Sequence, residues 1–220
     1  MKFAPIAIIS AGILALAAPA IAGEPKTYDL PEFDRIDVSA GIVLVAEVGS
    51  PQTVVVETDR GDFSDFQIDV KSGRLKVTRK WNRLAWHGAK ADYKVTISVR
   101  DLHALEASSG SRAKIMNIDA PKFLIDLSSG AQVFLEGACE ECTVDLSSGA
   151  NLNAKELVCD VANIDVSSGG HGEMFVTRAV VADASSGGHV SIYGNPDRVN
   201  VDRSSGGRIK IKSGAQASRD

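Results

Sequence analysis

The stretch Ile125-Asp126-Leu127-Ser128-Ser129-Gly130 has two close copies, Val144-Asp145-Leu146-Ser147-Ser148-Gly149 and Ile164-Asp165-Val166-Ser167-Ser168-Gly169. Ser-Ser-Gly itself occurs six times, beginning at Ser108, Ser128, Ser147, Ser167, Ser185 and Ser204, so that successive copies are 20, 19, 20, 18 and 19 residues apart. The residues before and after most copies alternate between apolar and polar side chains, which is typical of strands with one buried face. A unit of strand, glycine corner and strand at this period predicts one coil of a solenoid.

We therefore predict an all-β fold, a right-handed parallel β-helix-like solenoid of about six coils of 18–20 residues. The right hand is expected because parallel crossovers almost always have it. An antiparallel meander is the alternative, but it would place the turns about 9.6 Å apart, two strand spacings, where identical turn residues gain nothing from each other. In a parallel stack equivalent residues lie about 4.8 Å apart, so that serine hydroxyls could form a hydrogen-bonded ladder. The repeated serines favour the stack.

The region before the repeat, residues 23–101, carries strand-like runs separated by turn signals such as Gly49-Ser50-Pro51 and Lys71-Ser72-Gly73. We expect a partly antiparallel β region here that caps the first coil and belongs to the same domain as the repeat region, residues 102–220. The segment Lys80–Asp92 has no strand pattern and holds Trp81 and Trp86. These tryptophans are candidates for an aromatic binding loop, or they fold back over the end of the core.

Residues 1–22 have the layout of a secretory signal peptide, with Lys2, an apolar run and small residues at the end. The protein is therefore expected to be exported, to the periplasm or to the extracellular medium. No later segment approaches the roughly 20 apolar residues of a membrane-spanning helix. The net charge of −4 gives no general electrostatic case for nucleic acid.

Aligning the coils on Ser-Ser-Gly places one aspartate of each coil in a single outward column, called the acidic column here, with Glu106 at its end: Asp126, Asp145, Asp165, Asp183 and Asp202. The column is either a solvated stripe that discourages unwanted sheet pairing or a stripe that binds cations such as calcium. No calcium-loop sequence accompanies it, so the metal interpretation has weak support.

The same alignment defines a second outward column, the polar column, which is the candidate binding face: Arg112, Gln132, Asn151, His171, His189 and Arg208. His171 and His189 are neighbours in this column. Two stacked imidazoles could bind a transition metal, but a polar surface without a fixed third ligand is the more economical explanation.

Cysteine occurs at three positions, Cys139, Cys142 and Cys159. Cys139 and Cys159 each lie eight residues before a Ser-Ser-Gly copy, so they occupy the same point of successive coils. Stacked corners about 4.8 Å apart fall within the Cα separation that a disulfide requires. We predict a Cys139–Cys159 disulfide, with Cys142 inward and free.

Nucleophile elbows, Walker loops, zinc-protease motifs and zinc spacings are absent from the sequence, so no cofactor and no catalytic residues are assigned. The order and spacing of several segments, however, resemble a known family. These segments are Phe33–Gly41, Val54–Asp59, Leu75–Val77 and Leu102–Gly110, followed by the Asp-Leu-Ser-Ser-Gly coils. The chain resembles the head GIN domain family of putative autotransporter adhesins. The resemblance implies an exported β-helical domain without known catalytic residues.

The leading functional hypothesis is a non-enzymatic, adhesin-like binding module of the bacterial envelope, whose flat faces contact a glycan or an envelope protein. The alternative is a polysaccharide lyase or hydrolase, since such chemistry needs paired carboxylates and the acidic column supplies carboxylates. Equal spacing in every coil looks structural, whereas an active site should interrupt the repeat at one place. Pairing of solenoids into a homo-oligomer is left open.

Overall fold

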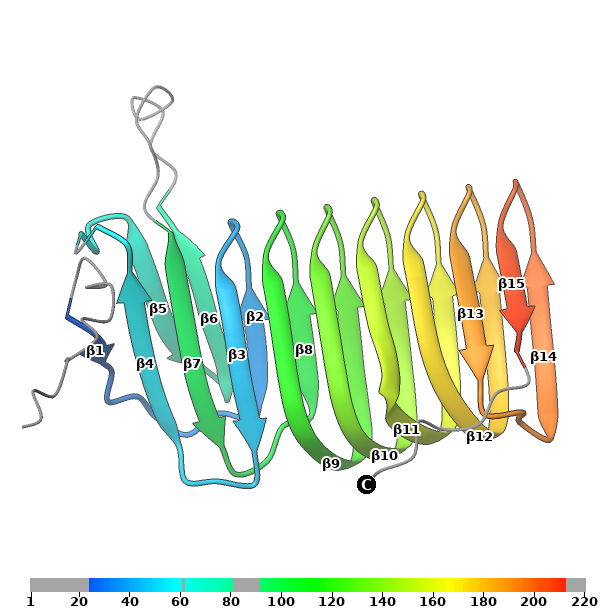
Figure 1. Cartoon of the computed structure of the whole chain (residues 1–220), viewed down its shortest axis with the longest axis horizontal. Helices are drawn as coiled ribbons and strands as arrows, with labels where there is room; N and C mark the ends of the chain where they lie inside the picture. Colours follow the sequence, from blue (N-terminus) through cyan, green and yellow to red (C-terminus); the bar gives the residue numbers. More distant parts are fainter. Residues whose placement is uncertain (1–23, 61, 81–91, 213–220) are drawn as a thin grey trace, which may run out of the picture.

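The computed structural model describes residues 24–60, 62–80 and 92–212, which form strands and no helix (Figure 1). The strands belong to one continuous hydrogen-bonded system. Their bounds are β1 (Lys26–Thr27), β2 (Arg35–Val38), β3 (Val43–Val48), β4 (Thr53–Thr58), β5 (Phe66–Lys71), β6 (Arg74–Arg79), β7 (Tyr93–Val99), β8 (Ala104–Ala107), β9 (Arg112–Leu127), β10 (Gln132–Leu146), β11 (Asn151–Val166), β12 (His171–Ala184), β13 (His189–Tyr193), β14 (Arg198–Arg203) and β15 (Arg208–Ile211).

These strands coil into a β-solenoid of about five turns, close to the six predicted. Each of β9 to β12 begins after one Ser-Ser-Gly turn, bends at its middle and ends at the next turn (Figure 1). Successive strands pair in parallel, and equivalent residues lie opposite one another, as in Asp126, Asp145 and Asp165. The predicted parallel stack is therefore confirmed. The segments that follow the turns form one broad face, called the post-turn sheet, and the segments that precede them form the other, the pre-turn sheet.

The Ser-Ser-Gly corners are tight turns whose two central residues are left-handed. In the turn at 128–131, Ser129 has a φ of 49° and Gly130 a φ of 74°, and the amide of Ala131 donates to the carbonyl of Ser128 at 3.1 Å. Two central residues with positive φ define a type I′ turn, which favours glycine at the second of them.

Backbone groups, not serine hydroxyls, join one turn to the next. The amide of Gly130 donates to the carbonyl of Ser148 at 3.1 Å, and the same bond recurs from Gly149 to Ser168 at 3.2 Å. Among the described residues no hydroxyl of a Ser-Ser-Gly motif bridges two turns, so the expected hydroxyl ladder is wrong. The Ser-Ser-Gly motif repeats because this backbone geometry lets a carbonyl of one turn accept a hydrogen bond from an amide of the neighbouring turn.

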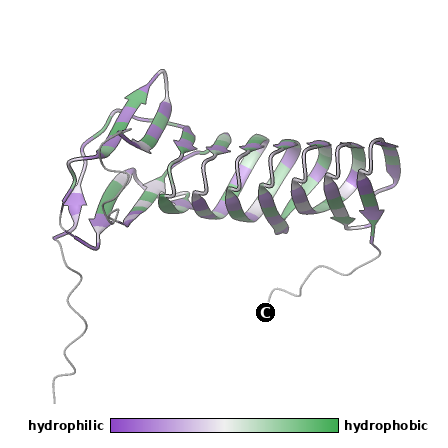
Figure 2. Ribbon diagram, turned by 90° about the horizontal axis from the view of Figure 1, so that it is seen from above, coloured by the Kyte–Doolittle hydropathy of each residue, from purple (hydrophilic) through white to green (hydrophobic). Residues whose placement is uncertain are grey.

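The core is a column of inward side chains that fills the space between the two sheets. Strand β10 shows the alternation, because Val144 and Leu146 are buried and Thr143 and Asp145 are exposed. Figure 2 shows hydrophobic and hydrophilic residues alternating in this way along the coils. Each fully buried Val, Leu or Ile contributes about 1.5–3 kcal/mol relative to exposure, and each coil covers the apolar side of the next.

The N-terminal region extends both sheets and closes one end of the solenoid. Strands β2 and β3 are joined by Ser39-Ala40-Gly41, in which Ala40 and Gly41 have φ values of 63° and 74° like the central residues of the later turns. On one sheet, β3 pairs in parallel with β7, β7 pairs antiparallel with β4, and β4 pairs antiparallel with β1. On the other sheet, β2 pairs in parallel with β6, and β6 pairs antiparallel with β5. Three strand pairs of this region, β1–β4, β4–β7 and β5–β6, are therefore antiparallel.

Several predictions concern residues that the structure does not describe. The predicted signal peptide at 1–22 and the tryptophans Trp81 and Trp86 of the predicted aromatic loop lie outside the described residues. Among the described residues, no helix is long and apolar enough to cross a membrane.

Candidate binding face and cysteine cluster

The six residues of the polar column lie in register on the outer surface of the post-turn sheet. Gln132 lies opposite Arg112 and Asn151, and His171 lies opposite Asn151 and His189, which in turn faces Arg208. Each residue is the first of its strand and comes four positions after the first serine of a turn. The turn therefore fixes where each side chain emerges, and neighbouring side chains repeat about every 4.8 Å along the solenoid.

The imidazoles of His171 and His189 form a parallel stack at one end of this column. Their ring centroids are 5.1 Å apart and their planes differ by 15°. Because the nitrogen lone pairs lie in the ring planes, two parallel rings do not direct nitrogens at one metal ion. Burial lowers the pKa of His189, and the positive charges of His171, Lys210, Arg208 and Lys212 lower it further. Both effects favour the neutral imidazole of His189, and the pair offers a flat, polar-edged surface.

Sequence reasoning missed a polar network beside the histidines. Tyr193 Oη donates to Glu173 Oε1 at 2.9 Å, and Glu173 Oε2 lies 3.2 Å from Lys155 Nζ. Lys212 Nζ donates to Tyr193 Oη at 2.9 Å and lies 4.9 Å from the centroid of the tyrosine ring. Burial alone would raise the pKa of Glu173, but hydrogen bonds from Tyr193 and Lys155 and the charges of Lys155 and Lys212 lower it below its usual value.

A signal for this network was present in the sequence. Lys155, Tyr193 and Lys212 each come eight residues after the first serine of a turn. The alignment that revealed the polar column at the fourth residue would have placed these three residues together at the eighth, but not their contact with Glu173, which comes six residues after Ser167.

The acidic column runs along the opposite, pre-turn sheet. Register pairs join Asp126, Asp145, Asp165, Asp183 and Asp202, and the column continues through Glu106 to Asp37. The five aspartates are exposed. Partial burial and the charge of Asp126 raise the pKa of Asp145. At the N-terminal end cations meet the column: Arg74 lies 2.8 Å from Glu106 and Lys76 lies 3.8 Å from Asp37.

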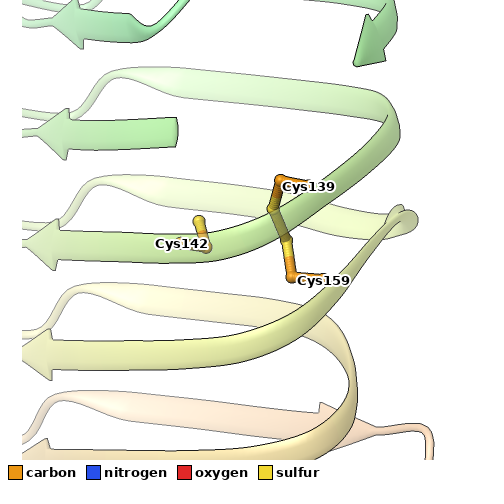
Figure 3. Close-up of side chains that lie close together, drawn as sticks. All are labelled: Cys139, Cys142 and Cys159. Atoms are coloured by element: carbon orange, nitrogen blue, oxygen red, sulfur yellow. A yellow bond between two sulfur atoms is a disulfide. The ribbon is translucent and has the colours of Figure 1, made fainter. Parts of the chain in front are cut away.

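Three cysteines lie together where β10 and β11 bend (Figure 3). Cys139 and Cys159 face each other in register and are joined by a disulfide, with Cα atoms 4.6 Å apart. The thiol of Cys142 is free and fully buried, and its sulfur lies within 4.8 Å of the other two. Burial raises the pKa of Cys142 to about 12. A thiol held in its neutral form is a poor nucleophile, so Cys142 acts in packing.

Two open grooves lie in the N-terminal cap, away from the polar column. One, of about 630 Å³, is lined by Arg35 and Arg100, but these cations already lie 3.3 and 3.1 Å from Asp34 and Glu32. In the other, of about 510 Å³, Lys26 lies 4.9 Å from the centroid of the Tyr28 ring. The polar column, by contrast, lies on a flat sheet surface, the geometry expected for an extended ligand.

The family model described as putative auto-transporter adhesin, head GIN domain, matches residues 32–196, which include β2 to β13 and all but the last Ser-Ser-Gly turn. The chain belongs to this family. The resemblance seen in the sequence is thereby confirmed.

One solved structure shares the fold at low sequence identity, and two further structures are matched at lower TM-scores. A putative adhesin from Bacteroides fragilis has a TM-score of 0.63 and 16% identity, over 86% of this chain and 96% of that one. A putative lipid binding protein from Parabacteroides distasonis (TM-score 0.49, 14% identity) and a putative adhesin from Parabacteroides merdae (0.47, 15%) are matched over the same shares. No curated protein matches this chain in sequence.

Proposed function

We propose that this head GIN domain protein is an exported, non-enzymatic, adhesin-like binding module, and that the post-turn sheet binds a glycan of the cell envelope through the polar column. The observation that carries the proposal is the uninterrupted register of six polar side chains on one flat parallel sheet. Amide, guanidinium and imidazole groups repeated at strand spacing match the repeated hydroxyls of an extended polysaccharide. Membership of an adhesin family supports a binding role.

The proposal is tested by measuring binding of the purified protein to immobilised neutral and charged glycans and to envelope extracts. The variant Gln132→Ala/Asn151→Ala removes two amides from the middle of the polar column, and its affinity should fall about thirtyfold because each of the two lost hydrogen bonds contributes roughly 1 kcal/mol. Thr143→Ala/Asn163→Ala is the matched control, because these residues are exposed neighbours on the pre-turn sheet.

Unchanged affinity in the first variant, or an equal loss in both, would show that the post-turn sheet is not the binding face. Release of new sugar ends from any glycan would contradict the non-enzymatic assignment.

A further inference from the structure

The C-terminal end of the post-turn sheet carries an excess of positive charge, although the protein as a whole is acidic at −4. The basic patch is defined here by six outward residues of β11, β13 and β15 and the position after β15: Lys155, His189, Tyr193, Arg208, Lys210 and Lys212. Glu173 is the acid that meets this patch in the polar network, and Lys155 already pairs with it. The patch therefore retains unneutralised positive charge.

Arg208 and Lys210 are the cations of this patch that are available to a ligand. Both side chains are exposed and occupy adjacent outward positions of β15, opposite His189 and Ser191 of β13. Neither forms an ion pair with another described residue, whereas Lys155 and Lys212 are engaged by Glu173 and Tyr193. An exposed guanidinium and an exposed ammonium side by side suit an acidic group, which a guanidinium can bind through two parallel hydrogen bonds.

Flat rings lie next to these cations. His189 lies opposite Arg208 in register and stacks on His171, and the ring of Tyr193 lies at the other end of β13. Rings of this kind provide contact area for sugar rings and polar edges for their hydroxyls. The exposed large hydrophobic residues of the described chain, Leu124, Val181, Val199 and Ile211, occupy the pre-turn sheet or inward positions of the last coil, so this face lacks side chains that would enter a membrane.

We propose that the basic patch binds acidic polysaccharides, with Arg208 and Lys210 contacting the carboxylates of the sugar chain and the His171–His189 stack contacting its rings. This inference rests on the proposed glycan-binding function and names the ligand class. It also predicts where on the post-turn sheet the carboxylates of the polysaccharide bind, which the polar column alone does not.

The pKa of His189 should change when an acidic ligand binds to the basic patch. The groups that face it are His171 and Glu173 from β12 and Arg208, Lys210 and Lys212 from the other side, and the cations outnumber the single acid. The pKa of His189 is below its usual value in the free protein. A bound carboxylate would stabilise the imidazolium and raise this pKa, so binding should tighten as the pH falls from the pKa of the complex towards the lower pKa of the free protein.

The experiment compares trigalacturonate with its methyl ester, which keeps the sugar rings and removes the negative charges. We expect the acid to bind at least about tenfold more tightly than the ester, and Arg208→Gln/Lys210→Gln to lose about tenfold in affinity for the acid, as for two exposed ion pairs. Lys122→Gln/Arg198→Gln is the matched control, because Lys122 and Arg198 are exposed cations in one register column of the pre-turn sheet. The pKa of His189, followed by NMR, should rise on adding the acid and stay unchanged with the ester.

Equal affinity for acid and ester, no binding of the acid, or an equal loss in the two charge variants would overturn the inference. Binding to phosphatidylglycerol vesicles in place of trigalacturonate would overturn it in favour of a lipid surface. These outcomes leave the proposed function standing wherever a neutral glycan still depends on Gln132 and Asn151, so that the two failures are distinguishable.

Discussion

The second serine of each turn adopts a backbone conformation that L residues rarely adopt. Ser129, Ser148 and Ser168 have φ values of 49°, 50° and 47°, and the glycine that follows each has a φ near 74°. A left-handed residue with a side chain costs roughly 1–2 kcal/mol, which glycine avoids. This cost recurs in every coil, and in every coil the same inter-turn hydrogen bond offsets it. The preference for glycine therefore belongs to one position of each turn.

Gly149 and Gly188 distinguish the destabilisation caused by backbone conformation from the destabilisation caused by a steric clash. A Cβ at Gly149 would meet nothing within 4 Å, but the φ there is 73°, so Gly149→Ala should lower the free energy of unfolding by about 1–2 kcal/mol. At Gly188 no positive φ is involved, but a Cβ would lie 2.3 Å from the carbonyl oxygen of Val166 in the preceding coil. Gly188→Ala should therefore cost more, about 3 kcal/mol, because two coils must separate. Urea unfolding curves measure both, and equal losses would contradict this account.

At the scale of the strand, the bend of β10 and β11 is where the repeat is least regular. The pairing of β11 with β12 shifts between Ala154 and Val158, so Lys155 lies in a stretch without register partners in β12. The coils, the two outward columns and the facing of Cys139 and Cys159 follow from the spacing of Ser-Ser-Gly, because parallel stacking keeps equivalent residues opposite each other.

The contact of Lys155 with Glu173 could not be predicted by counting residues, because an irregularity of this kind changes which side chains meet. The pairing of the strands β4 to β7 was equally out of reach, although the sequence indicated strands in this region. β6 pairs with β2 and β7 pairs with β3 through contacts distant in sequence, with no repeat to mark them.

Cys142, on the same strand, gives a measure of how well the bend is packed. The unperturbed thiol titrates near 9.0, and burial raises the pKa in the folded protein to about 12. The folded state therefore keeps its proton where the unfolded state loses it, and between these two pH values the thiol should lower stability by about 1.4 kcal/mol per pH unit as the pH rises. The measurement is the free energy of unfolding against pH for the protein and for Cys142→Ala.

Other groups titrate in the same range, so the informative quantity is the difference between the two curves. Below pH 9 that difference should be constant, and above it the difference should shrink in favour of the variant. Parallel curves up to pH 11 would mean that the thiol reaches solvent in the native state.

At the scale of the whole molecule, the two ends of the solenoid are finished differently. The N-terminal end is covered by β1, β4 and β7 on one sheet and by β5 and β6 on the other. At the C-terminal end, β14 and β15 each have one described neighbour, and Val199 and Ile211, at inward positions, are 45% and 39% exposed. Open parallel edges with uncovered apolar side chains invite pairing with a second copy.

Arg203 opposes such pairing. It occupies the inward column that holds Ala107, Leu127, Leu146, Val166 and Ala184 in the preceding coils, and it is exposed where those residues are buried. A second solenoid stacked on this end would have to bury the guanidinium without a partner, at a cost of several kcal/mol. Arg203→Val should therefore increase self-association, seen by sedimentation velocity as a larger, concentration-dependent species. Arg198→Val makes the same change on the outward side of the same strand and should leave the sedimentation coefficient unchanged. Association of both variants to the same extent would show that edge charge in general, not the inward arginine, keeps the end of the solenoid free.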